Sequence, residues 1–321
     1  MAQIGLLPGC ASTQGAGGVN VHVPTQEMLD DAVRRTIAEA KKPDSSGTGT
    51  YRVTKHVLDT LPSSVVYQPT DLSAVTRPMP VYVFGNGACS TDGAKSRHHL
   101  LEIASHGYLA ISPGGIYSGP DIKMTPESIR SHDFKADPLL IGQAVDWAIR
   151  ENSRAGSPFY GKIDTSKIVL SGYSCGGYQV LGYAGDPRVS SYVILNSGVF
   201  PKAYIPMDGA VLGKEALNRI TVPILYVTGG PEDVAYSVAR DDVRRIHKAP
   251  VIWIDTPATH AGTFAEPNGG RVAQAVVQWL DWTTRGDKQA AAWFTGPDCT
   301  LCTSPQWTVT RRNQALLGKL R

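Results

Sequence analysis

Ile168-Val169-Leu170-Ser171-Gly172-Tyr173-Ser174-Cys175-Gly176-Gly177 is the stretch of sequence that decides the fold of this chain. It begins as a short apolar run rich in β-branched residues, passes through Gly-x-Ser-x-Gly and continues into a segment that can be helical, 178–181. A strand, a sharp turn carrying one serine and then a helix form a nucleophile elbow. Side chains at Gly172 and Gly176 would collide with the neighbouring strand or helix, so glycine is required there. The pattern predicts Ser174 as a nucleophile.

The composition excludes several classes of protein. The chain has 321 residues, of which 42% are hydrophobic and 18% charged, and its formal net charge is +3. This hydrophobic content is enough for a substantial core, and the low charge argues against a disordered chain or a nucleic-acid-binding protein. No apolar run approaches the roughly 18 residues that a membrane-spanning helix needs, so no membrane span is expected.

Strands and helices alternate along most of the chain. Apolar runs predict strands at 51–58, 64–68, 80–84, 108–112, 168–171, 192–195, 223–228 and 251–255, and helical spacing predicts helices at 25–41, 95–106, 138–151 and 272–282. The first two strands are expected to be antiparallel. The fold class is therefore α/β, with a mostly parallel central sheet, helices on both faces and a ligand site beyond the carboxyl ends of the strands.

The domain organisation follows from the same pattern. Residues 1–24 are expected to be a flexible lead-in; within them Leu6–Cys10 is similar to the end of a lipoprotein signal but lacks its basic start and apolar stretch. Residues 25–287 form one α/β domain, with loop or small cap regions near 113–138 and 200–218. Residues 288–321 are a C-terminal tail packed on that domain.

A nucleophilic serine needs a base, and His260 is the best of the eight histidines. It alone follows the last strong strand in a loop; His132, in the long loop 113–138, is the alternative. The orienting acid should stand at a strand end between the serine and the histidine in the chain, where Asp233 fits best. Glu232, Asp255, Asp241 and Asp242 stay open as alternatives.

Two backbone N–H groups are expected to form an oxyanion hole. One belongs to Cys175, directly after the serine, and the other to the loop after the strand at 80–84. Asn86 is favoured in that loop because it follows a glycine that lets the backbone turn inward. Gly87 and Ala88 remain possible.

Three features together resemble the α/β-hydrolase superfamily: the elbow, the loop Gly85-Asn86-Gly87-Ala88 and the segment Ile103–Tyr108. They are most similar to its dienelactone-hydrolase-like, platelet-activating-factor-acetylhydrolase-like and cutinase-like polyester esterase branch, over residues 50–285. The resemblance implies Ser174 as nucleophile, Asp233 as acid and His260 as base, with Asn86 and Cys175 as oxyanion donors. Cys175 departs from the Met or Gln that often follows the nucleophile in this branch.

The chain has five cysteines. The side chain of Cys175 is expected to pack beneath the elbow as a small buried thiol rather than act as a nucleophile. Cys299 and Cys302 form a CxxC without further metal ligands at a suitable spacing, so a local disulfide is favoured over a zinc or redox site. Such a bond implies an oxidising compartment, secreted or periplasmic, whereas free thiols would suit the cytoplasm.

The expected activity is hydrolysis of a carboxylic ester, small or polymeric, through an acyl-enzyme, with no metal or organic cofactor. A lactonase, peptidase or acyltransferase with the same three residues is an alternative, as is a non-catalytic binding protein. The expected substrate-binding residues are aromatic or apolar neighbours of the predicted site, namely Tyr173, Ile116, Tyr117 and Phe264, with Trp307 of the tail a further candidate. The sequence does not specify the acyl group or the oligomeric state.

Overall fold

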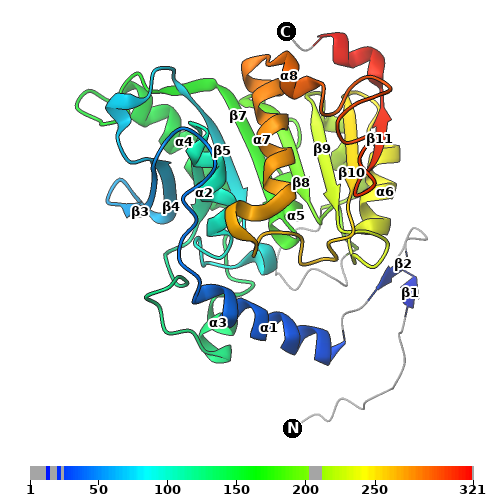
Figure 1. Cartoon of the computed structure of the whole chain (residues 1–321), viewed down its shortest axis with the longest axis horizontal. Helices are drawn as coiled ribbons and strands as arrows, with labels where there is room; N and C mark the ends of the chain where they lie inside the picture. Colours follow the sequence, from blue (N-terminus) through cyan, green and yellow to red (C-terminus); the bar gives the residue numbers. More distant parts are fainter. Residues whose placement is uncertain (1–11, 15–19, 23–24, 202–211, 320–321) are drawn as a thin grey trace.

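Nine strands form one mixed sheet in the order β11-β10-β9-β8-β7-β5-β6-β4-β3 (Figure 1). The computed structural model describes residues 12–14, 20–22, 25–201 and 212–319. Within these ranges the strands of the sheet are β3 (Val53–Leu58), β4 (Leu61–Pro69), β5 (Met79–Gly85), β6 (Leu109–Pro113), β7 (Ile163–Tyr173), β8 (Val189–Leu195), β9 (Ile224–Thr228), β10 (Val251–Asp255) and β11 (Thr308–Arg312). Cys10 and residues 202–211 of the expected cap lie outside the described residues.

The six central strands, β10 through β6, run parallel to one another, as expected from the alternation of strands and helices. The antiparallel strands lie at the two edges. β3 pairs with β4, and β4 pairs with β6, so the first two strands of the sheet are antiparallel as expected. β11 pairs antiparallel with β10 at the opposite edge.

Helices cover both faces of the sheet. On one face lie α4 (Leu139–Ser153), α5 (Cys175–Leu181) and α6 (Tyr236–Arg245), and on the other α2 (Arg97–Ser105), α7 (Gly270–Arg285) and α8 (Lys288–Ala291) (Figure 1). Alternate residues of β5 divide between the two cores: Val81 and Val83 pack with α4, whereas Tyr82 and Phe84 pack with α2. Both faces are thus buried, which explains the nearly continuous apolar composition of the central strands.

The remaining elements lie outside the main sheet and its covering helices. β1 (Ser12–Gln14) and β2 (Asn20–His22) pair antiparallel within the segment expected to be a flexible lead-in. α1 (Gln26–Ala40) begins at Thr25, whose side chain accepts the Met28 N–H, and α1 contacts α3 (Pro126–His132). Short 3₁₀ helices are η1 (Leu72–Ala74), η2 (Gly87–Cys89), η4 (Lys214–Arg219), η5 (Pro267–Gly269) and η6 (Gln314–Lys319).

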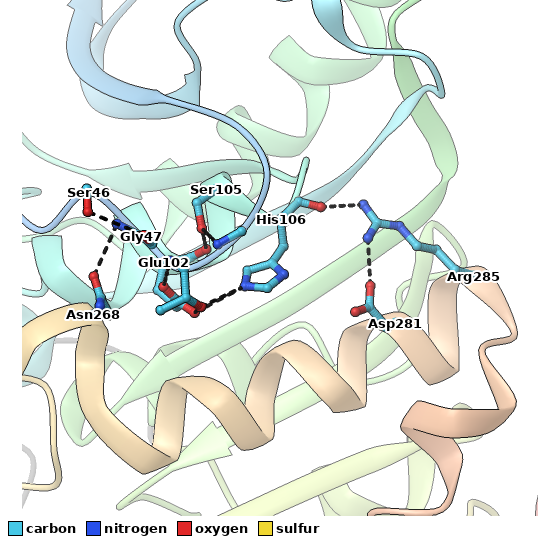
Figure 2. A network of polar contacts seen from close by, with 10 residues as sticks. Ser46, Gly47, Glu102, Ser105, His106, Asn268, Asp281 and Arg285 are labelled. Atoms are coloured by element: carbon cyan, nitrogen blue, oxygen red, sulfur yellow. Dashed lines mark hydrogen bonds and ion pairs between the residues drawn. The ribbon is translucent and has the colours of Figure 1, made fainter.

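A polar network ties α2 to the chain before β3 and to α7 (Figure 2). The Glu102 carboxylate is 1% exposed, accepts hydrogen bonds from the Thr48 N–H and hydroxyl, and pairs with His106 at 3.1 Å. Burial alone would raise the pKa of Glu102, but the hydrogen bonds from His106 and Thr48 hold it below its ordinary value. At the end of α2, Arg285 of α7 donates to the His106 carbonyl.

Several elements were not expected from the sequence, among them α3, α6 and β11. α3 interrupts the long loop 113–138, where its capping box at Thr125 and Ser128 gives a local signal without helical hydrophobic periodicity. α6 follows the loop that carries Asp233 and extends from Tyr236 to Arg245. β11 has the sequence Thr-Val-Thr-Arg-Arg, which is too polar for a buried strand and suits an edge. Within the described ranges, no helix is both long and apolar enough to cross a membrane.

Candidate active site

The carboxyl ends of five parallel strands meet at one edge of the sheet. Each strand is followed by a polar residue or a polar loop. Because the strands run parallel, these polar groups gather at the same side of the sheet. These strands are β5, β7, β8, β9 and β10, and the residues that follow them include Asn86, Ser174, Asn196, Asp233 and His260.

The turn between β7 and α5 has the geometry of a nucleophile elbow. Ser174 has φ 51° and ψ −123°, a backbone conformation that L-residues rarely adopt. A Cβ atom on Gly176 would lie 2.1 Å from the Gly85 carbonyl carbon, and one on Gly172 would lie 2.5 Å from that of Gly176. The two glycines of the motif are therefore required by close backbone contact, as the sequence pattern predicts. Ser174 is held further by Ser197, whose hydroxyl donates to its carbonyl at 2.5 Å.

Three side chains that lie far apart in the sequence form one line of hydrogen bonds. His260 Nε2 is 2.9 Å from Ser174 Oγ, and His260 Nδ1 is 2.6 Å from Asp233 Oδ1. The side chain of Asp233 is fully buried, whereas that of His260 is 29% exposed. A solvent-accessible imidazole held between a hydroxyl and a buried carboxylate can take a proton from the hydroxyl and keep the resulting charge paired.

The Asp233 carboxylate accepts four hydrogen bonds. Besides His260, its donors are the backbone N–H groups of Gly229 and Ala235, both at 2.9 Å, and the Asn196 side-chain amide at 2.7 Å. Burial would raise the pKa of Asp233, but the bonds from His260 and the two N–H groups hold it below its ordinary value. The carboxylate therefore stays ionised and can fix the imidazole in one orientation.

Asn196 is a site residue that the sequence patterns did not identify. It follows β8 with φ 45°, and its amide donates to both Asp233 and the Thr259 carbonyl, one residue before His260. It thereby joins the loops that carry the carboxylate and the imidazole. Its position at a strand end beside Ser197-Gly198 is a signal that could have marked it.

Tyr173, expected to bind substrate, is largely packed under the site. Its hydroxyl donates to the His260 carbonyl at 2.7 Å, and its ring lies 4.5 Å from that of Phe264 and 5.5 Å from that of His260. Phe264 is 8% exposed and also packs against Phe84 and His99. The two aromatic residues nearest the predicted site thus support its loops from beneath.

Ile116 and Tyr117 are in a different position. Ile116 is partly buried against the α2–α7 core, whereas Tyr117 is 43% exposed and its ring stacks on His132 at 3.9 Å. Trp307 in the C-terminal segment packs against the same core as Ile116. No described contact joins these three side chains to Ser174 or His260.

The expected oxyanion loop passes next to the start of α5. The Asn86 side chain is 1% exposed, and both its nitrogen and its oxygen are hydrogen-bonded. Its amide donates to the Ser90 and Pro113 carbonyls, and its Oδ1 accepts from the Ser112 hydroxyl. A Cβ on Gly176 would lie 2.6 Å from the Asn86 backbone nitrogen. The backbone at Asn86 and the start of α5 are therefore in direct contact, with no side chain between them.

The cysteines differ from expectation at one position. Cys299 and Cys302 form the expected disulfide. Cys175, expected to be a free buried thiol, is bonded to Cys89 of η2. The expectation of a free thiol was wrong because it treated Cys175 alone, although both cysteines flank segments predicted to meet at the same sheet edge.

The alternative base and acids have other partners. His132 Nδ1 is 3.1 Å from the Thr91 hydroxyl. Asp255 accepts hydrogen bonds from the Thr228 hydroxyl and the Gly230 N–H, and Asp242 and Asp241 pair with Lys214. Glu232 is exposed. Among the described side chains, only that of Asp233 pairs with His260.

No model of a known protein family matches the chain. A curated relative, "Hydrolase ORFZ" from Pyricularia oryzae (strain 70-15 / ATCC MYA-4617 / FGSC 8958), is 29% identical over 139 residues. The match covers 42% of this chain and 30% of the relative, so the chain spans under a third of that protein's length. The similarity is to a protein named a hydrolase, and it does not extend to a named substrate.

Proposed function

We propose that this chain is a serine esterase of the α/β-hydrolase superfamily that cleaves carboxylic esters through an acyl-enzyme. The observation that supports this most strongly is the hydrogen-bonded line Ser174–His260–Asp233, with 2.9 and 2.6 Å between the bonded atoms, at the carboxyl edge of a mostly parallel sheet. The similarity to a protein named a hydrolase agrees with it. In this proposal residues 25–287 are the hydrolase domain, and the tail 288–321 packs on it and supplies the edge strand β11.

The first half of the reaction acylates the serine. Ser174 Oγ attacks the ester carbonyl carbon while His260 Nε2 takes its proton. Asp233 holds the imidazole by its Nδ1–H and stabilises the imidazolium that forms. The carbonyl oxygen becomes an oxyanion, which accepts hydrogen bonds from the backbone N–H groups of Cys175 and Asn86. Collapse of this intermediate expels the alcohol, which takes the proton from His260.

The second half returns the enzyme to its starting state. A water molecule gives its proton to His260 Nε2 and attacks the acyl carbon, and a second oxyanion forms in the same hole. Ser174 leaves with the proton from His260, and the carboxylic acid is released. The 29% exposure of the His260 side chain is consistent with entry of that water. In this cycle every proton transfer is to or from His260.

The test is a substrate panel measured with the full-length protein and two variants. The proposal predicts hydrolysis of p-nitrophenyl esters, loss of turnover in Ser174→Ala, and a loss of about 10⁴-fold in Asp233→Asn, which orients the wrong tautomer. Rapid cleavage of p-nitroanilides or lactones in preference to esters, or transfer to an added alcohol in preference to water, would assign the same residues to a peptidase, lactonase or acyltransferase. No turnover of any of these substrates would favour a non-catalytic binding protein.

A further inference from the structure

The disulfide Cys89–Cys175 joins the two segments that carry the proposed oxyanion donors. Cys175 is the first residue of α5 and follows Ser174 directly, while Cys89 ends η2, four residues after β5 ends at Gly85. The two cysteines are 86 positions apart in sequence, and their Cα atoms are 5.1 Å apart. Cys89 is 0% and Cys175 7% exposed, so the bond lies inside the protein.

The backbone of the η2 loop is unusual. Ala88 and Cys89 have φ values of 54° and 43°, in the left-handed region that non-glycine residues seldom occupy. Two consecutive residues of this kind persist only when their surroundings hold them. Without such restraint, the loop would relax to conformations in which its N–H groups point elsewhere.

Non-covalent restraints hold this loop on more than one side: the Tyr173 ring lies against Gly87, and the Asn86 side chain donates to the Ser90 and Pro113 carbonyls. The Ala88 carbonyl accepts the Phe134 N–H at 2.7 Å, and the Cys89 carbonyl accepts those of Lys135 and Ala136 at 3.1 and 2.9 Å. On the inner side, Gly85 and Gly176 touch through their backbones without interlocking side chains. The disulfide is the covalent link across this contact between two backbone segments.

We propose that Cys89 and Cys175 are positioning residues whose disulfide fixes the distance between the two halves of the oxyanion hole. This inference rests on the proposed esterase function. Oxyanion donors act by being preorganised, and loss of one such donor lowers kcat by about 10²–10³. Loosening the spacing of two donors lowers the rate less than deleting one, and it affects the tetrahedral intermediate more than the bound ester. Removal of the disulfide therefore lowers kcat about ten- to hundredfold and changes KM little.

The experiment compares two double variants of the full-length chain. Cys89→Ala/Cys175→Ala removes this disulfide and keeps both backbone N–H groups, and the matched control Cys299→Ala/Cys302→Ala removes the other disulfide. The measurements are kcat and KM for a p-nitrophenyl ester and the affinity for a trifluoromethyl ketone, which forms a tetrahedral adduct with a nucleophilic serine. The expected result is a parallel fall in kcat and ketone affinity in the first variant alone. A kcat within twofold of the control, or a rise in KM that accounts for the whole loss, overturns the inference.

A second measurement covers the case in which the first variant does not fold. The control variant retains only the Cys89–Cys175 disulfide among the bonded pairs, and it can be treated with dithiothreitol under native conditions. Each disulfide reduced takes two electrons and two protons, and dithiothreitol closes to its cyclic disulfide. The proposal predicts that kcat falls in proportion to the thiols that mass spectrometry counts and recovers on reoxidation. Unchanged kcat in fully reduced, folded protein contradicts it, whereas a wild-type chain that hydrolyses no ester contradicts the proposed function itself.

Discussion

The hydroxyl of Tyr173 donates a hydrogen bond of 2.7 Å to the backbone carbonyl of His260. Tyr173 immediately precedes Ser174, so the residue beside the proposed nucleophile holds the loop of the proposed base. The Tyr173 ring also lies 5.5 Å from the imidazole and directly against Gly87 of the proposed oxyanion loop. One partly buried side chain thus links the elbow, the His260 loop and the proposed oxyanion loop.

Tyr173→Phe tests this connection because it removes the hydroxyl and keeps the ring. A neutral hydrogen bond contributes about 0.5–1.5 kcal/mol, so we expect kcat to fall about two- to tenfold as the His260 loop loosens. Tyr160→Phe, at a side chain that is 60% exposed, is the control and should leave kcat unchanged. Equal kcat values for both variants in p-nitrophenyl ester assays would show that the bond has no part in positioning His260.

Asn196→Gly tests the second support of the Asp233 carboxylate. Glycine accepts the φ of 45° without strain, so the substitution removes the amide and little else. Hydrogen bonds to charged groups contribute about 1.5–3 kcal/mol, and we expect kcat to fall about ten- to hundredfold.

Asn313→Gly provides a matched control for that measurement. Asn313 also has a left-handed φ, 56°, and its amide also donates to two carbonyls, those of Ile246 and Ala249, at the far end of β10. Both variants should lose stability in thermal melts, but only Asn196→Gly should lose turnover. A comparable loss of kcat in Asn313→Gly would mean that general destabilisation explains both.

Glu102→Gln tests the polar network at α2 and gives a pH dependence. The folded-state pKa of Glu102 lies below its ordinary value, so the ionised carboxylate stabilises the protein above that ordinary value. This stability is lost as the pH falls through the lowered folded-state pKa. We expect Glu102→Gln to reduce the free energy of unfolding by about 1–3 kcal/mol at pH 7.

Urea denaturation at a series of pH values from 7 downward checks the direction of this pH dependence. The difference between wild type and Glu102→Gln should shrink as the pH falls below the ordinary pKa of a glutamate, about 4.3. Glu232→Gln, at an exposed position, should differ little from wild type at any pH. A Glu102→Gln difference that stays constant with pH would exclude the ionised carboxylate as the source of the stability.

The two disulfides should stabilise the chain unequally. In the loop-entropy model a bond across 86 positions contributes about 4–5 kcal/mol, and one across 3 positions contributes about 2 kcal/mol. The Cys89→Ala/Cys175→Ala variant should therefore unfold at a clearly lower urea concentration than Cys299→Ala/Cys302→Ala. Equal midpoints with equal slopes would indicate residual structure in the unfolded chain that already holds residues 89 and 175 together.

The fold and the central residues of the site could be predicted because their signals are local. The glycines of the elbow belong to a local five-residue motif, and β10 follows from four consecutive buried apolar residues. The order serine, acid, histidine at separate strand ends selected Ser174, Asp233 and His260, which the structure brings within hydrogen-bonding distance.

The features that could not be predicted depend on contacts between distant segments. The strand-end position of Asn196 could mark it as a site residue, but its pairing with Asp233 depends on the adjacent ends of β8 and β9. The Cys89–Cys175 bond likewise needs the adjacency of β5 and β7. The sequence also did not show how far the side chains of Tyr173 and Phe264 are buried, because an aromatic residue near a site can either line it or support its loops.

Intact-mass and peptide analysis after treatment with a fluorophosphonate tests the central claim most directly, because this reagent phosphonylates a serine only when an adjacent base activates it. We predict one adduct per chain, on Ser174, with no adduct and no ester hydrolysis in Ser174→Ala. An unlabelled wild-type chain, or a Ser174→Ala variant that hydrolyses esters at the wild-type rate, would contradict the assignment of Ser174 as the nucleophile.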